Sequence, residues 1–530
     1  YGPAEYGGGG SLDSGDKSRF YYRGMRFKLD WEKGTGELAA VLFRPSPALA
    51  LPNSFDDHGF PETALYAQSH RYFTNCFNSN PTNGASTIGI WMERGDQAVP
   101  VVFVGRVKDW PLLAEERFKG GMPADTAHAM FLWCDLNGDG QVQPQEITYR
   151  TGESGGITVQ PDLSLVMNID GHATRLAVRK TTDAGVLVYD LTAGETIAEG
   201  AQLPTTSGGD QALLGPQGSA AFTIAPKPFA PESLGGTTGG KATWSYPSLW
   251  PGLHASHESP PPAFPGEVIG TTRILGESVT PRASDVGPIW FVNGNMGNFY
   301  AFTYDGLFVA TLFHDVREAG LWAMPTAIRG MRLNDISLHD ENFWPTVTQT
   351  PDGLIYAIDG ARTSIVRIDG LESIRRIPPT TLEVTEQSIE QARVYQLEHE
   401  AVRQRAAGQE LLEVELRASP PKVDGRLDDW ATSRWATIDK RGVAAFFNSD
   451  SKPYQIEAAV AVAGPRLYAA FRTADKDLLQ NSGELPDAPF KTGGALDLMI
   501  GSDSAASPSR NQPAPGDLRL LITLLKGKPR

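Results

Sequence analysis

One hydrophobic pattern recurs between about Phe20 and Ile377. A short apolar run meets a turn rich in Pro, Asp or Gly, and a second apolar run follows at once. Asp-Gly and related turns between apolar runs are strong hairpin signals. The clearest of these turns lie at residues 161–162, 215–218, 305–306 and 351–353. The pattern predicts a series of antiparallel hairpins, and several of them carry a further short strand.

The recurring units predict a β-propeller, partial or complete, over residues 1–380. Their spacing is irregular, roughly 55–75 residues, which is wide for a propeller blade and leaves room for inserted loops. Each unit can bury its sheet face only against its neighbours, which favours a ring of blades. A large β-sandwich and a β-helix are the alternatives, and the hairpin turns inside each unit argue against the β-helix.

A helix interrupts the strand pattern. Residues 385–407 are rich in Glu, Gln, Ala and Arg, contain no Gly or Pro, and are followed by Gly408. Apolar residues recur at helical spacing at Ile389, Ala392, Leu397 and Ala401. We therefore expect a helical linker over residues 381–410, packed on one domain by this narrow apolar stripe.

Strand patterns return over residues 411–530. The expected strands are 411–418, 456–463, 467–472, 495–500 and 518–525. No helical pattern lies between them, which predicts an antiparallel β-sandwich. Five strands are too few to close such a sandwich, so we expect it to be incomplete. Because the sequence begins with Tyr1 and stops just after an apolar run, we expect a fragment whose export signal lies upstream.

Charge and hydropathy narrow the possible partners. The 530 residues include 62 Asp and Glu against 47 Lys and Arg, a formal charge of −15. Such a surface repels polyanions, which argues against a nucleic-acid partner. No apolar run approaches the ~20 residues needed to cross a bilayer, so we expect no membrane span. The oligomeric state is not predicted.

The most specific chemical motif is residues 135–146, which match the EF-hand loop position by position. Six residues are expected to bind Ca²⁺ through side-chain oxygens, a backbone carbonyl or a bridging water: Asp135, Asn137, Asp139, Gln141, Gln143 and Glu146. Gly140 allows the sharp turn that the loop requires. The chain has no second such loop and this one has only three carboxylates, so we expect a structural site of extracellular-grade affinity.

Histidines offer a weaker second metal site. His254, His257 and His339 would share a metal if their loops met at the propeller axis, and a lyase or hydrolase could then act there. The spacing is not the His-Glu-x-x-His signature, and isolated histidines commonly bond backbone groups in turns. Since no credible pair of nucleophile and base is present, we expect a binding protein rather than an enzyme. The metal-dependent enzyme and a protein–protein platform are the alternatives.

The two cysteines leave the redox state open. Cys76 and Cys134 belong to no metal-binding motif. They form either one disulfide, as in an exported protein, or two partly buried thiols.

Two resemblances add an expectation about function. Residues 423–431, Val-Asp-Gly-Arg-Leu-Asp-Asp-Trp-Ala, resemble the opening motif of family 9 carbohydrate-binding modules, and residues 467–475 and 494–500 look like that family's middle strands. The resemblance covers about residues 411–530. The first region is similar to bacterial NHL-type propellers with an inserted EF-hand loop. Together they imply a multidomain secreted, periplasmic or cell-surface protein that recognises carbohydrate, with Trp430 and Trp435 packing the sandwich.

Overall fold

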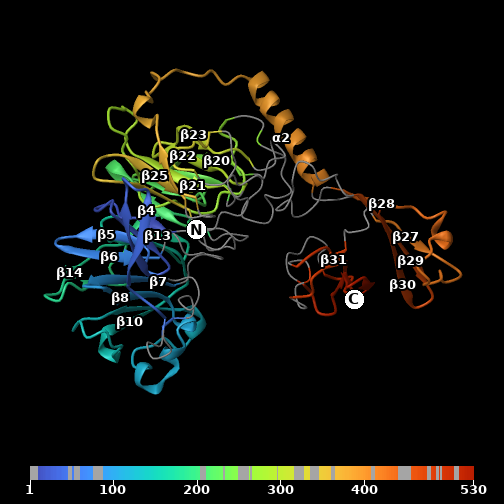
Figure 1. Cartoon of the computed structure of the whole chain (residues 1–530), viewed down its shortest axis with the longest axis horizontal. Helices are drawn as coiled ribbons and strands as arrows, with labels where there is room; N and C mark the ends of the chain where they lie inside the picture. Colours follow the sequence, from blue (N-terminus) through green and yellow to red (C-terminus); the bar gives the residue numbers. More distant parts are fainter. Residues whose placement is uncertain are drawn as a thin grey trace. The chain divides into compact units, whose positions relative to one another are not determined.

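The structure is a computed structural model. It describes residues 10–45, 51–52, 60–75, 87–202, 210–230, 233–248, 262, 265–294, 296–315, 328–334, 345–359, 364–406, 412–439, 455–473, 479–484, 489, 492–506 and 513–529. Antiparallel β-strands dominate these residues (Figure 1). The prediction of an all-β fold is therefore confirmed. In the described residues, no helix combines the length and the apolar character that crossing a membrane requires.

The chain divides into two compact units. The first extends to Arg403 and the second begins at Gln404. The division falls inside helix α2 (Glu386–Ala406), within the segment expected to link two domains.

In the described part of the first unit, six antiparallel sheets follow one another along the chain, here called sheets 1 to 6. Sheet 1 contains β1 (Ser11–Leu12), β2 (Arg19–Tyr22), β3 (Met25–Asp30) and β4 (Thr35–Val41). Sheet 2 contains β5 (Thr63–Ala67), β6 (His70–Thr74), β7 (Thr87–Arg94), β8 (Gln97–Arg106), β9 (Ala129–Cys134) and β10 (Ile147–Thr151). Sheet 3 contains β11 (Ser154–Val159), β12 (Leu165–Ile169), β13 (His172–Leu176) and β16 (Glu195–Glu199).

Sheets 4 to 6 have three or four strands each. Sheet 4 contains β17 (Ala212–Leu214), β18 (Ser219–Phe222), β19 (Leu234–Thr238) and β20 (Lys241–Tyr246). Sheet 5 contains β21 (Ile289–Asn293), β22 (Phe299–Thr303) and β23 (Phe308–Leu312), and sheet 6 contains β24 (Thr346–Gln349), β25 (Ile355–Ile358) and β26 (Ile365–Ile368). A separate pair, β14 (Lys180–Thr181) and β15 (Leu187–Val188), lies between β13 and β16 in the sequence.

The four hairpin turns predicted from the sequence are present. They join β11 to β12, β17 to β18, β22 to β23 and β24 to β25. Two of them are closed by an Asp that accepts a bond from the preceding Thr hydroxyl: Thr303 to Asp305 and Thr350 to Asp352, both at 2.6 Å. The short polar side chain satisfies groups that the tight turn would leave unpaired. The turns predicted from the Asp and Gly positions are therefore present in the structure.

Neighbouring sheets share apolar cores, and the last sheet packs against the first. A cluster of Leu12 and Phe20 from sheet 1 with Tyr356 and Ile358 from sheet 6 is buried. Cores also connect sheets 1 and 2, sheets 2 to 5, and sheets 5 and 6. The sheets remain separate rather than forming one closed sheet. The cyclic order of contacts supports the propeller, which stays a prediction.

The described part of the second unit contains three small sheets, two of which are mixed. Its strands are β27 (Val414–Leu416), β28 (Ala436–Asp439), β29 (Gln455–Ala463), β30 (Arg466–Thr473), β31 (Gln480–Asn481), β32 (Leu496–Ile500), β33 (Leu518–Ile522), β34 (Leu524–Leu525) and β35 (Lys528–Pro529). The pairs β27–β29 and β31–β34 are parallel, so the expectation of a purely antiparallel arrangement is wrong for them. A long connection precedes the second strand of each pair, and such crossovers permit parallel pairing.

Trp430, from the motif at residues 423–431, packs in the core of the sheet that contains β29 and β30. Trp430 is buried against Ala459, Ala461 and Ala470, and the Arg417 guanidinium lies 4.6 Å from its ring centroid. Trp435 packs at the edge of the same cluster. Both tryptophans thus pack the second unit, as expected.

Helix α2 forms where the sequence predicted it, but its apolar stripe is not buried. Ile389 and Leu397 remain 59% and 56% exposed. The helix begins with a cap in which the Ser388 N–H donates to the Thr385 hydroxyl at 3.1 Å. Its Glu390–Arg393 ion pair lies on the surface. Local capping and high helix propensity account for this helix, and the expected packing of its stripe is wrong.

Candidate calcium loop and polar cavity

The EF-hand-like loop connects two strands of sheet 2. Cys134 ends β9 and Ile147 begins β10, and Trp133 pairs with Ile147 in the antiparallel register. The flanks are therefore strands rather than the helices of an EF-hand. Glu146 is buried at the end of the loop, where its carboxylate accepts a bond of 3.1 Å from the Trp133 indole N–H. The core of sheet 2 thus fixes both ends of the loop.

Carboxylates turn into this loop and accept backbone hydrogen bonds. Asp135, which is fully buried, accepts from the N–H groups of Asp139 and Gly140, both at 3.0 Å. Glu146 accepts from the N–H of Gln143 at 3.3 Å. Gly140 has φ +72°, the left-handed conformation that the sharp turn requires. The backbone of this loop therefore folds around the carboxylates of Asp135 and Glu146.

The amide side chains complete the same cluster. The Asn137 amide nitrogen donates to Asp139 at 3.0 Å and to the Gln143 amide oxygen at 3.1 Å. The Gln143 amide nitrogen donates to Asp139 at 2.8 Å. Five of the six predicted ligands therefore converge in one hydrogen-bonded cluster. Its acceptors are all oxygens, the donor set that Ca²⁺ prefers.

A cation at this loop would need more than carboxylates. Across the described ranges, no three His, Cys, Asp or Glu side chains form a group that could hold a metal. Amide and backbone oxygens would have to complete the shell. Burial raises the pKa of Asp135 and Glu146, whereas the Gln141 N–H lowers the pKa of Asp139. Calcium binding remains a prediction that this geometry accommodates.

The other predicted metal site and one cysteine cannot be placed. His254, His257 and His339 lie outside the described residues, as does Cys76. Cys134 is a free, buried thiol, and burial raises its pKa to about 11. A thiol in this state is a poor nucleophile at neutral pH. Cys134 is therefore a core residue of sheet 2.

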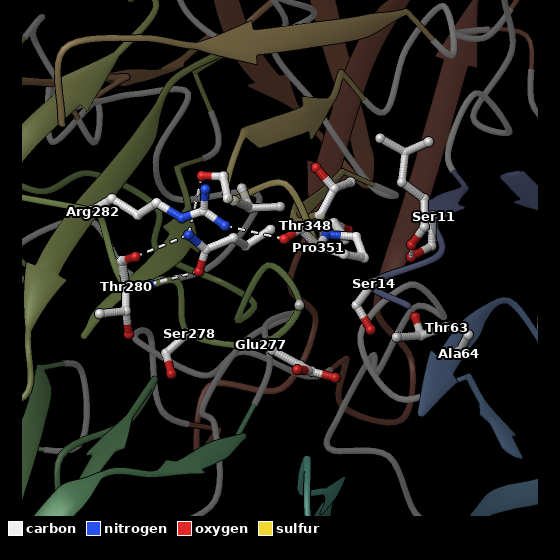
Figure 2. Close-up of a pocket in the computed structure, with 16 residues that line it drawn as sticks. Ser11, Ser14, Thr63, Ala64, Glu277, Ser278, Thr280, Arg282, Thr348 and Pro351 are labelled. Carbon is white, nitrogen blue, oxygen red and sulfur yellow. Dashed lines mark hydrogen bonds between the residues drawn. The ribbon is translucent and has the colours of Figure 1, made fainter. Parts of the chain in front are cut away.

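A second feature, which the sequence did not indicate, is a polar cavity of about 500 Å³. Its walls come from sheet 1, from sheet 2, from residues 276–282 before β21, and from residues 347–353 at β24 and its turn. Hydroxyls and one carboxyl dominate the lining: Ser11, Ser14, Thr63, Glu277, Ser278 and Thr348. In Figure 2 the Glu277 carboxyl points toward the side of the cavity that carries Ser14 and Thr63, and Arg282 lies on the other side.

Glu277 is the unusual residue in this cavity. It is half-buried, and no hydrogen bond or ion pair holds its carboxyl among the described residues. Burial, with a smaller contribution from the negative charge of Asp13, raises the pKa of Glu277 to about 7. A carboxyl with these properties in a cavity is typical of functional sites, although structural networks also produce them.

The nearby Asp13 is bonded on all sides. It is fully buried and accepts from the Tyr21 hydroxyl at 2.7 Å and from the Arg71 guanidinium at 3.1 Å. The Tyr66 hydroxyl donates to its other oxygen. Arg71 also pairs with Glu93 within sheet 2, and Glu93 in turn pairs with Arg26 of sheet 1 at 2.9 Å, so the network joins the two sheets. This network is structural, and it places a matched negative charge beside the cavity.

One feature of the sequence could have identified Glu277 as a candidate functional residue. It interrupts the apolar run Ile274-Leu275-Gly276-Glu277-Ser278-Val279, whose other large side chains are buried. A carboxyl inside such a run has either a partner or a function. The nearby Trp244 and Tyr246 have a structural role, since both rings pack against Phe302 between sheets 4 and 5.

Comparisons with known proteins identify no family. No family model and no curated protein matches the sequence. Among solved structures, the chain is similar to the computationally designed protein Ika8, with a TM-score of 0.29 and 9% identity over 68% of this chain and 96% of that one. It is also similar to a candidate phosphatase from Bacteroides thetaiotaomicron, with a TM-score of 0.32 and 10% identity over 69% and 72% of the two chains. Similarities this weak carry no inference about function.

Proposed function

We propose that this chain is part of a secreted, calcium-stabilised binding or scaffold protein that recognises carbohydrate. The observation that carries the calcium part is the convergence of Asp135, Asn137, Asp139, Gln143 and Glu146 in one oxygen-rich cluster. A single loop between two strands has no partner helix to move, so the ion would stabilise the fold rather than signal. Three carboxylates suit the millimolar Ca²⁺ outside cells.

The carbohydrate part has a different basis. It is supported by the resemblance of residues 423–431 to family 9 carbohydrate-binding modules. The buried Trp430 fits a packing role for that motif, so a sugar would contact other residues. A glycan array probed with the full chain tests this part, and uniformly flat binding would remove the carbohydrate claim.

The calcium part is tested by thermal unfolding of the full chain with Ca²⁺ or with a chelator. A ligand at a hundred times its Kd stabilises the folded state by about 2.7 kcal/mol, so a clear rise in Tm is expected. Asp139→Ala should abolish the rise. Asp183→Ala is the matched control, because Asp183 is exposed in a turn whose Ala184 lies beside the loop at Gly138.

Two results would contradict the calcium proposal. One is a wild-type Tm that does not change between calcium and chelator. The other is an equal rise in wild type and Asp139→Ala, which would place the ion elsewhere in the molecule.

A further inference from the structure

Two polar groups in the cavity lack partners in the described part of the chain. Thr63 is only 6% exposed, and its hydroxyl has no hydrogen-bond partner there. The Glu277 carboxyl likewise has none. Buried polar groups are nearly always satisfied in folded proteins, so the unsatisfied Thr63 hydroxyl indicates a ligand or water in this cavity, and the half-buried Glu277 carboxyl in the same lining could bind it too.

The charge of the lining residues favours a positively charged ligand. Glu277 is the one carboxyl among the lining residues, and its ionised form makes the wall beside Ser14 and Thr63 negative. Arg282 also lines the cavity, but it is exposed, and its guanidinium donates to the Pro351 carbonyl at 3.1 Å. A positive group beside Glu277 would restore the solvation that burial has removed, whereas an anion would add repulsion.

The serine and threonine residues of the lining favour a ligand that carries hydroxyl groups. Serine and threonine hydroxyls both donate and accept, as a polyol requires. The lining residues include no aromatic ring on which a neutral sugar could stack. A sugar held here would therefore need a charged anchor. The volume of about 500 Å³ lies in the range of small-molecule sites.

We propose that this cavity binds a protonated amino sugar, with its ammonium group on Glu277 and its hydroxyls on Thr63 and Ser14. This inference rests on the proposed carbohydrate recognition and names a site and a ligand class for it. It does not depend on the calcium loop. It also moves sugar recognition from the second unit, where the sequence resemblance lies, to the first.

Calorimetric titration of the full chain with glucosamine, glucose and N-acetylglucosamine at pH 7 tests the proposal. Glucosamine carries the ammonium group, whereas the other two are neutral sugars of similar shape. We expect glucosamine to bind at least tenfold more tightly than either neutral sugar. Glu277→Gln keeps the shape but removes the charge, and should weaken glucosamine binding at least tenfold.

Two further variants separate a specific site from general attraction to an acidic surface. Thr63→Val keeps the side-chain shape and should weaken glucosamine binding severalfold through loss of the hydroxyl. Glu116→Gln removes an exposed carboxylate, 88% accessible, that does not line the cavity, and should leave binding unchanged. Equal weakening by Glu116→Gln and Glu277→Gln would overturn the proposal, as would equal binding of the three sugars or no binding of glucosamine.

The titration distinguishes failure of this inference from failure of the proposed function. Glucosamine binding that persists in chelator, without any calcium effect on Tm, would leave the cavity site standing and remove the calcium part. Glycan binding on the array that Glu277→Gln does not affect would retain carbohydrate recognition and reject this cavity as its site.

Discussion

The loop at residues 135–146 and the cavity at Glu277 differ in how their carboxyls are bonded. In the loop, Asp135 and Glu146 each accept at least two hydrogen bonds from neighbouring N–H groups. In the cavity, Glu277 accepts none from the described residues. Neighbours in sequence supply the donors of the loop, whereas distant segments build the walls of the cavity. A carboxyl surrounded by its own backbone shapes a turn, and one left without donors is available to a ligand.

The largest effect should come from a carboxyl that is both buried and fully bonded. Asp13→Ala would leave the Arg71 guanidinium, whose side chain is 14% exposed, without one of its two carboxylate partners. Breaking a buried pair costs about 3–5 kcal/mol. We expect a loss of this size in the free energy of unfolding of the first unit, measured by urea titration.

Asp96 provides the control for this variant. It pairs with Arg26, but its side chain is 74% exposed. Asp96→Ala should therefore change the urea midpoint little. Similar losses in the two variants would show that the buried network at Asp13 has no special importance.

A smaller and pH-dependent effect should come from Glu277→Gln. The folded pKa is raised from 4.5 to about 7, so the folded state binds the proton more tightly than the unfolded state does. The wild type therefore loses stability as pH rises from about 4.5 through 7, and the variant does not. We expect Glu277→Gln to be more stable than wild type by about 1–3 kcal/mol at pH 8 and nearly equal to it at pH 4.

Thermal unfolding at the two pH values measures this difference. The exposed Glu116→Gln should show no such pH dependence. A Glu277→Gln variant that is less stable than wild type at pH 8 would mean that the carboxylate has a stabilising partner.

Gly140→Ala probes the loop with an effect of about 1–2 kcal/mol. A Cβ at this position meets nothing closer than a Val99 methyl at 3.7 Å, but φ is +72°. The left-handed backbone, rather than crowding, should therefore destabilise the variant. Gly120 is a matched control because it has open space and no positive φ, so Gly120→Ala should leave Tm unchanged. Equal Tm values for the two variants would show that the turn at Gly140 is not needed.

The smallest effect should come from Lys17→Ala. Lys17 and Asp352 form an exposed ion pair of 2.6 Å between turns of sheets 1 and 6, and this pair lowers the pKa of Asp352 to about 2. Exposed pairs contribute little and are screened by salt. We expect a small drop in Tm at low salt that disappears in high salt. A large, salt-independent drop would show that this contact holds the two sheets together.

What could be predicted from the sequence was local. The Asp and Gly turns at 305–306 and 351–353, the helix α2 and the backbone of the calcium-like loop each depend on residues that are close in sequence. The cavity could not be predicted, because Ser11, Thr63, Glu277 and Thr348 come together only through contacts between sheets. The parallel pairing of β27 with β29 also depends on the path of a long connection. The prediction that the apolar stripe of α2 packs on a domain was wrong. Helical periodicity shows that apolar side chains can share one face of a helix, but it does not show that another element covers that face.

The junction of sheets 1 and 6 has a consequence for biogenesis. Thr346 donates to the Gly10 carbonyl at 2.6 Å, a bond that spans 336 residues. At translation rates of about 5–20 residues per second, sheet 1 would wait on the order of 20–70 s for this partner to leave the ribosome. Its Leu12 and Phe20 side chains would be uncovered during that interval, which makes the nascent chain a natural client for chaperones.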